Sequence, residues 1–335
     1  MCGIVGIVGK SPVTERILGS LKRLEYRGYD SAGIAVVNNN HGLQYRKVVG
    51  KIAALDSKLK EEPISGNIGI GHTRWATHGE PAVRNAHPMI VDGVAVVHNG
   101  IIENHTALRR SLIKEGYKFE SETDTEVVPN LIASFLKRGL TPKQAAIETL
   151  KKLEGAFAIT IMIASEDNLL IGLKRGAPLA IGIGEGEMYL GSDALALSPF
   201  TNKIVYLDDN EFTEITKTSH TVYNKDGDEI QKSIRNIDSC TANVCKEEYE
   251  HYMLKEIHEQ PRVVSDILAY YHDKESKLDL DSIQWGKYDR IQFIGCGTSY
   301  NAACIAKYWF EHFLFTMGKN RRYSSSPKTL QSART

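Results

Sequence analysis

Short apolar runs separated by glycine, asparagine or aspartate dominate the first 225 residues of this 335-residue chain. The clearest are GIVGIVG, AGIAVV, GVAVVHNG and AFAITIMIA, at residues 3–9, 32–37, 93–100 and 156–164. Runs of this length between turn-forming residues predict many β-strands joined by tight turns. The faces of so many strands are buried most simply in stacked sheets.

Three segments with helical spacing interrupt these runs. Residues 11–28 place four apolar side chains at helical intervals. A second helix is expected to end at Gly116, and a third to run from an N-capping Thr123 to Gly139. Helices that stand alone among strand runs predict an α+β fold with layered antiparallel sheets rather than a regular βαβ alternation.

The sequence changes character after about residue 236. Residues 247–273 have helical spacing with Pro261 among them, and residues 288–313 predict an apolar strand, a glycine-rich turn and a helix. Such an order opens an α/β unit, but one unit cannot bury both faces of a parallel sheet. Residues 319–335 are polar and basic, so we expect the second domain to be incomplete.

Charge and cysteine usage exclude several classes of protein. Basic and acidic residues balance at 41 each, which gives no reason to expect nucleic acid or a membrane surface as a partner. No apolar run reaches the roughly 18 to 20 residues of a membrane span, and no basic segment precedes the apolar start as in a signal peptide. Five cysteines without a CxxC pair predict neither a disulfide framework nor a zinc site. We therefore expect a cytoplasmic protein with reduced thiols.

Cys2 would carry both a thiol and a free α-amine if Met1 were removed. The α-amine has a pKa of about 8 and a free thiol one of about 8.5, so the amine can take the thiol proton near neutrality. One residue then supplies nucleophile and base, which is the logic of N-terminal-nucleophile (Ntn) hydrolases. Most cysteines at position 2 are there by chance, so other segments must support this interpretation.

Polar residues after predicted strands supply what hydrolysis of an amino-acid side-chain amide requires. Arg74 has the planar guanidinium that suits an α-carboxylate. Asn99 and Gly100 can offer a side-chain and a main-chain N–H to a tetrahedral oxyanion. Asp124, just before a predicted helix, suits an α-ammonium group. Together these residues could supply what an amide hydrolase acting on an amino acid needs.

The motifs MCGIVGIVG, LEYRGYDSAGIA, GHTRWATHGEP, HNGIIEN and SETDTEV follow one another in this order. They resemble the glutaminase domain of the glutamine–fructose-6-phosphate aminotransferase (isomerizing), or glucosamine-6-phosphate synthase, family. EYEHYMLKEIHEQP and FIGCGTSYNA are similar to that family's linker and to the start of its sugar-isomerase (SIS) domain. The resemblance implies a four-layer αββα Ntn hydrolase sandwich followed by an incomplete α/β SIS-type unit.

The resemblance also implies domain boundaries. These are a class II glutamine amidotransferase domain at residues 2–225, a linker with helices at 226–284, the start of the SIS domain at 285–313 and an unrelated, disordered tail at 314–335.

Individual roles follow from the same resemblance. Cys2 would be the nucleophile, its α-amine the base, and Asn99 with Gly100 the oxyanion hole. The residues implied in glutamine binding are Arg74, Trp75, Thr77, His78, His87, Asp124, Arg27 and Gly28. Thr298 and Ser299 match positions at the sugar-phosphate end of the isomerase site, where a helix N-terminus suits a phosphate.

The family's reaction converts L-glutamine and D-fructose 6-phosphate into L-glutamate and D-glucosamine 6-phosphate. The resemblance implies a homodimer that uses no metal or other cofactor. Because the isomerase part stops early, we expect this chain alone to retain at most the hydrolysis of glutamine to glutamate and ammonia.

Three alternatives remain open. Another class II amidotransferase, such as amidophosphoribosyltransferase or asparagine synthetase, would share the glutaminase motifs, although no SGGxD motif or phosphoribosyl-pyrophosphate loop follows here. A catalytically inactive product could act only by binding or regulation. Four histidines could suggest a metal site, but no HxH or HExxH spacing supports one; they are His72, His78, His87 and His98.

Overall fold

A computed structural model describes residues 2–38, 42–237, 249, 251–272, 287, 291–295 and 297–316. The chain forms two compact units, Met1–Tyr252 and Met253–Thr335. Within the described part, no helix has the length and apolar character needed to cross a membrane.

The first unit contains an eight-stranded antiparallel sheet. Its strands are β1 (Gly3–Val8), β2 (Ser31–Asn38), β3 (Gly42–Val49), β4 (Ile68–Arg74), β9 (Ala180–Ile183), β10 (Met188–Gly191), β11 (Lys203–Tyr206) and β15 (Arg235–Asn236). They lie in the order β15–β11–β9–β10–β1–β4–β2–β3. The N-terminal strand β1 is therefore central, between β10 and β4.

A second antiparallel sheet has seven strands. They are β5 (Met89–Val91), β6 (Val94–Ile102), β7 (Gly155–Ile163), β8 (Leu170–Arg175), β12 (Glu211–Ile215), β13 (His220–Tyr223) and β14 (Glu229–Ile230). Their order is β14–β13–β12–β8–β7–β6–β5. Strands β14 and β15 extend the sheets past residue 225, while the domain boundaries from the sequence remain predictions.

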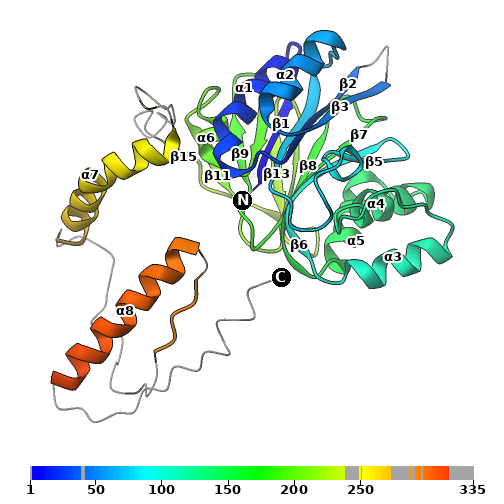
Figure 1. The fold of residues 1–335 in the computed structure, drawn as a ribbon. Helices are drawn as coiled ribbons and strands as arrows, with labels where there is room; N and C mark the ends of the chain where they lie inside the picture. Colours follow the sequence, from blue (N-terminus) through cyan, green and yellow to red (C-terminus); the bar gives the residue numbers. More distant parts are fainter. Residues whose placement is uncertain are drawn as a thin grey trace. The chain divides into compact units, whose positions relative to one another are not determined.

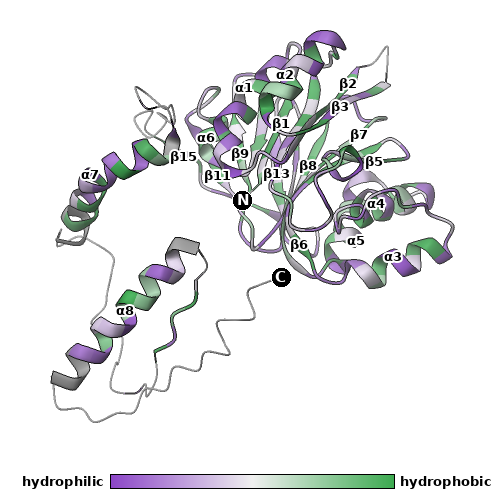
Figure 2. Cartoon of the chain, in the orientation of Figure 1, coloured by the Kyte–Doolittle hydropathy of each residue, from purple (hydrophilic) through white to green (hydrophobic). Residues whose placement is uncertain are grey.

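Helices cover the outer faces of both sheets (Figure 1). Those of the first unit are α1 (Thr14–Leu24), α2 (Ile52–Glu61), α3 (His105–Lys114), α4 (Val127–Lys137), α5 (Pro142–Lys152) and α6 (Ala194–Leu197), with short 3-10 turns at Glu25–Arg27 and Val83–Asn85. Helices α1, α2 and α6 pack on the first sheet, and α3, α4 and α5 on the second. Figure 2 shows hydrophilic and hydrophobic residues on both α1 and α2, as expected of helices with one buried face.

Three apolar cores hold the layers together, and strand alternation explains their composition. On β1, Ile4 and Val8 point into the core between the sheets. Val5 and Ile7 point to the opposite face, where they pack with α1 and α2. The third core joins the outer face of the second sheet to α4 and α5. The result is the four-layer αββα sandwich, which confirms the predicted fold class.

The expected helix at residues 123–139 begins later than predicted. The structure starts α4 at Val127, with Glu126 as its N-cap residue, so Thr123 is not the cap. Pro129 gives the physical reason, because it lacks an N–H and is tolerated only in the first turn of a helix. A start at Thr123 would have placed Pro129 in the helix interior.

Helix α5 was not expected from the apolar spacing. It starts with Thr141 and Gln144 in a reciprocal capping box, and Pro142 occupies its first turn. The predicted end of α3 is confirmed, since Gly116 adopts a φ of 92° directly after the helix.

The second unit contains two long helices, α7 (Tyr252–His272) and α8 (Gly297–Thr316). Helix α7 continues through Pro261, and hydrophilic and hydrophobic residues alternate along it (Figure 2). Residues 291–295 precede α8 and form no strand, contrary to the sequence prediction. A strand needs a neighbour to satisfy its main-chain groups, and no other strand is described in this unit.

Candidate active site

Strand alternation brings three polar side chains to the inner faces of the two sheets. Cys2 directly precedes β1 and lies two residues before Ile4, whose side chain faces the core between the sheets. Ile4 is paired with His72 on β4. Asn99 on β6 has the parity of Ala95 and Val97, which also face the core between the sheets. The side chains of His72 and Asn99 therefore meet between the sheets, where the Asn99 amide also bonds to the main-chain carbonyl oxygen of Cys2.

Cys2 lies against the main chain of Trp75. The Trp75 N–H donates to the sulfur at 3.2 Å, and the thiol lies 3.6 Å from the Trp75 carbonyl oxygen. Burial raises the pKa of the Cys2 thiol above its ordinary value, and the hydrogen bond with the Trp75 main chain opposes this rise only in part. The thiol thus needs a base before it can act as a nucleophile at neutral pH.

Two residues hold the main chain around Trp75 in place. The Asp30 carboxylate accepts the Ala76 N–H at 2.8 Å, and the Asp30 N–H donates to the Arg74 carbonyl at 3.0 Å. Gly28 approaches so closely that a Cβ there would lie 2.8 Å from both Arg74 C and Trp75 N. Gly28 was expected at the site from the sequence but Asp30 was not, because the only signal for Asp30 is its place in the motif LEYRGYDSAGIA.

Asn99 and Gly100 lie beside the cysteine. Asn99 Nδ2 donates to the Cys2 carbonyl oxygen at 3.0 Å, which leaves the amide's second N–H for another acceptor. Gly100 has a φ of 116°, and a Cβ at this position would lie 2.0 Å from the Ala156 carbonyl oxygen. Only glycine fits this position without strain, so the structure explains the residue type at position 100.

Arg74 and Asp124 are charged groups that the fold buries. Arg74 is 4% exposed and Asp124 is 5% exposed. The Arg74 guanidinium donates to the carbonyls of His78, Gly79 and Glu80, while Asp124 Oδ2 accepts the Ile102 N–H at 2.8 Å. Burial lowers the pKa of Arg74, and the nearby Cys2 and Asp124 act in the opposite direction. The buried Arg74 cation therefore lies within electrostatic range of the thiol, and the buried Asp124 anion within range of Arg74.

The rest of the loop that carries the motif GHTRWATHGEP is more open. Trp75 is 45% exposed and meets the Tyr29 ring edge-on, with 5.6 Å between the centroids. Thr77 is exposed, and its hydroxyl lies 3.4 Å from Nδ1 of the half-buried His78. These exposed side chains lie on the same loop as the main chain that contacts Cys2.

Two residues that the resemblance implies in glutamine binding, Arg27 and His87, have other neighbours. Arg27 forms an ion pair with Asp193 and donates a hydrogen bond to the Tyr26 hydroxyl, and neither of these partners is a predicted site residue. His87 is buried with Thr125 and the rings of His72 and His98, rather than open to a substrate.

Thr298 and Ser299 are in the first turn of α8, in the second unit, and Ser299 is exposed. In the described parts of the chain, no group of three or more histidine, cysteine or acidic side chains is placed to hold a metal ion.

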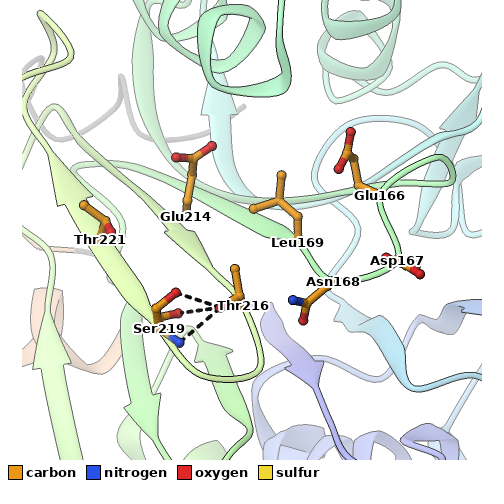
Figure 3. Close-up of a pocket in the computed structure, with 8 residues that line it drawn as sticks. All are labelled: Glu166, Asp167, Asn168, Leu169, Glu214, Thr216, Ser219 and Thr221. Atoms are coloured by element: carbon orange, nitrogen blue, oxygen red, sulfur yellow. Dashed lines mark hydrogen bonds between the residues drawn. The ribbon is translucent and has the colours of Figure 1, made fainter.

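A surface pocket of about 420 Å³ lies elsewhere in the first unit (Figure 3). It is formed by the turn before β8 and by the hairpin of β12 and β13. Three carboxylates line it, from Glu166, Asp167 and Glu214, but no predicted site residue, cysteine or histidine does. This pocket is therefore separate from the site around Cys2.

Comparison with known proteins gives a consistent result. A sequence family described as a glutamine amidotransferase domain matches residues 72–199. A curated relative from Mesorhizobium japonicum, named glutamine–fructose-6-phosphate aminotransferase (isomerizing), is 51% identical over 317 residues, covering 93% of this chain and 52% of the relative. A relative of the same name from Bradyrhizobium diazoefficiens is 49% identical over 322 residues, with the same coverages. The chain thus spans about half the length of the curated relatives it matches.

One solved structure with a similar fold is the glutamine phosphoribosylpyrophosphate amidotransferase from B. subtilis, complexed with ADP and GMP. Its TM-score is 0.58 and its sequence identity 27%, over 67% of this chain and 49% of that one. The αββα sandwich with a cysteine at the start of a central strand defines a class II glutamine amidotransferase domain of the Ntn type. Within this class, the curated relatives near 50% identity are aminotransferases (isomerizing) rather than amidophosphoribosyltransferases or asparagine synthetases. The chain is a relative of glutamine–fructose-6-phosphate aminotransferase (isomerizing) and corresponds to the glutaminase half of that family.

Proposed function

We propose that this chain hydrolyses L-glutamine to L-glutamate and ammonia, with Cys2 as the nucleophile. The observation that carries the proposal is the hydrogen bond from Asn99 Nδ2 to the Cys2 carbonyl oxygen, at 3.0 Å. It places a side-chain amide donor directly beside the nucleophilic residue. That arrangement suits a reaction in which negative charge develops on an oxygen next to the attacking sulfur.

The chemistry requires removal of Met1, which frees the α-amine of Cys2. The amine takes the proton of the thiol, and the sulfur attacks the side-chain amide carbon of glutamine. Asn99 Nδ2 and the Gly100 N–H stabilise the tetrahedral oxyanion. The ammonium group then returns its proton to the leaving nitrogen, and ammonia departs. Water attacks the resulting thioester, releases glutamate and restores the thiol.

Recognition of the amino-acid end of glutamine falls to Arg74 and Asp124. Arg74 binds the α-carboxylate and Asp124 the α-ammonium group, as their opposite charges and their burial near Cys2 favour. Thr77, His78 and Trp75 belong to the loop that closes over the bound amino acid. His87 is buried and supports these residues without contacting the substrate.

For the longer protein, we propose the transfer of this ammonia to D-fructose 6-phosphate, giving D-glucosamine 6-phosphate, in a cytoplasmic homodimer. Thr298 and Ser299 would contribute to the sugar-phosphate site there. The support is the name shared by relatives that are about twice as long as the region this chain matches.

Glutamate release by the purified 335-residue chain tests the proposal, after mass spectrometry has established that Met1 is absent. We expect glutamate and ammonia in equal amounts, at a rate unchanged by fructose 6-phosphate, and no glucosamine 6-phosphate. A chain that binds glutamine without releasing glutamate would instead be a binding or regulatory protein. Glucosamine 6-phosphate above a no-enzyme control would place the complete synthase activity in this chain.

A further inference from the structure

The amide of Asn99 is held in one orientation by two hydrogen bonds. Its Nδ2 donates to the Cys2 carbonyl oxygen at 3.0 Å, and its Oδ1 lies 2.9 Å from Nε2 of His72. His72 Nε2 also lies 3.0 Å from the His98 carbonyl oxygen, which can only accept. Nε2 of His72 must therefore carry the proton and donate it to both oxygens.

We propose that His72 is a positioning residue for the oxyanion hole, because its Nε2–H fixes the Asn99 amide with the Nδ2 group facing the Cys2 end of the site. This inference rests on the proposed glutaminase function. Without the donor, the amide can turn over, and its oxygen would then face the developing oxyanion. Such a reversal replaces an attractive contact by a repulsive one in the transition state.

His72 is suited to this role because it stays neutral. It is fully buried and packs on the His87 ring with 4.3 Å between the centroids. Burial lowers the pKa of His72 to about 3, so the ring holds one proton across the neutral range. Nδ1 of His72 has no hydrogen-bond partner among the described residues, as expected when the single proton is on Nε2.

A closed set of hydrogen bonds holds the second acceptor of His72 in place. The His98 N–H donates to His87 Nδ1 at 3.3 Å, so His87 carries its proton on Nε2, which lies 3.2 Å from Thr125 Oγ1. The Thr125 hydroxyl can then donate to His98 Nδ1, at 2.9 Å. This set fixes the backbone of His98, whose carbonyl shares the His72 proton, and assigns His87 a supporting role.

Kinetics of matched variants test the role of His72. His72→Leu removes the donor, whereas His72→Gln can return an N–H close to the original Nε2 position. We expect His72→Leu to lower kcat at least about 10-fold with KM changed less than about twofold, and His72→Gln to recover most of the loss. His220→Leu, at a half-buried histidine on β13, is the control and should change neither parameter.

A double-variant cycle separates positioning from a general loss of packing. In an Asn99→Ala background, His72→Leu should lower kcat by less than about twofold, because the group it positions is gone. An unchanged kcat in His72→Leu would overturn the proposal. So would an equal loss of kcat with and without Asn99, or a loss that His72→Gln does not reduce.

Nitrogen-15 NMR of the wild-type chain tests the same inference without relying on catalysis or on a variant that folds. We expect the His72 ring to be in the neutral Nε2–H form from pH 8 to pH 5. An Nδ1–H form, or protonation of the ring near pH 6.5, would overturn the positioning role. Absence of glutamine hydrolysis in the wild type, together with the Nε2–H form, would instead overturn the proposed function alone.

Discussion

The main-chain N–H of Trp75 points at the sulfur of Cys2, with 3.2 Å between nitrogen and sulfur. This N–H is at the end of β4, and the sulfur is directly before β1, so the pairing of two adjacent strands sets their distance. A hydrogen bond donated to sulfur stabilises the thiolate over the thiol. The first sheet thus partly offsets the cost of ionising a buried cysteine.

We expect Gly28→Ala to displace the Trp75 N–H from the Cys2 sulfur. A Cβ at residue 28 would lie 2.8 Å from Arg74 C and Trp75 N, and the main chain cannot yield as a flexible side chain would. Glutamine hydrolysis should fall at least about 10-fold, because displacement of a reacting group by about 1 Å has effects of this order or larger. Steady-state kinetics at saturating glutamine would measure the loss.

Gly19→Ala is the matched control. Gly19 lies in α1 with nothing within 4 Å of an added Cβ. The variant should keep full activity and gain about 0.5–1 kcal/mol in free energy of unfolding. Full activity in Gly28→Ala would show that the Trp75 main chain does not control the thiol.

Loss of either buried charge near Cys2 should weaken glutamine recognition. Removing one partner of a buried, hydrogen-bonded charge pair costs about 2–5 kcal/mol of binding. We therefore expect Arg74→Ala and Asp124→Asn each to lower kcat/KM at least about 30-fold, which a glutamate assay at low glutamine concentration would measure. Asp92→Asn, at an exposed aspartate paired with Lys137, should leave kcat/KM unchanged. Wild-type values in both site variants would remove these residues from the recognition site.

The three buried histidines should make folding stability depend on pH. Burial lowers the pKa of His72, His87 and His98, so these rings stay neutral in the folded chain at pH values where the unfolded chain binds protons. The unfolded state gains protons as the pH falls below about 6.5, so the free energy of unfolding must fall as well. Each ring contributes up to about 1.4 kcal/mol per pH unit.

Urea unfolding at pH 7.5, 6.0 and 5.0 would measure this dependence. We expect the unfolding midpoint to fall at each step, and to fall less steeply in His72→Gln, which has one titrating ring fewer. A midpoint that stays constant or rises between pH 7.5 and pH 5.0 would contradict the neutral, buried state of the three rings.

Local patterns predicted the elements that build the site, but not the contacts between them. The runs that became β1 and β6 were expected as strands, because apolar residues alternate or run continuously within them. Strand β3 was missed, since it lies at the sheet edge and carries polar residues such as Gln44 and Arg46. Edge strands need fewer buried side chains, so the apolar signal is weak there.

The bond between His72 and Asn99 could not be read from the sequence. It joins a strand of the first sheet to a strand of the second, and the order and register of strands are tertiary properties. The same holds for His87, which the resemblance implied in glutamine binding and whose ring is buried beside Thr125. The sequence shows the identity of each of these residues, but what each side chain contacts depends on how the two sheets stack.

The most direct test of the account compares two cysteine variants of the purified chain lacking Met1. Cys2 and Cys304 are both free and partly buried; Cys2 lies beside the Asn99 amide, whereas Cys304 is in α8 of the second unit. We predict that Cys2→Ala releases no glutamate from glutamine above the buffer control, while Cys304→Ala hydrolyses it at the wild-type rate and both variants unfold at the wild-type temperature. Glutamate release by Cys2→Ala at the wild-type rate would contradict the assignment of Cys2 as the nucleophile.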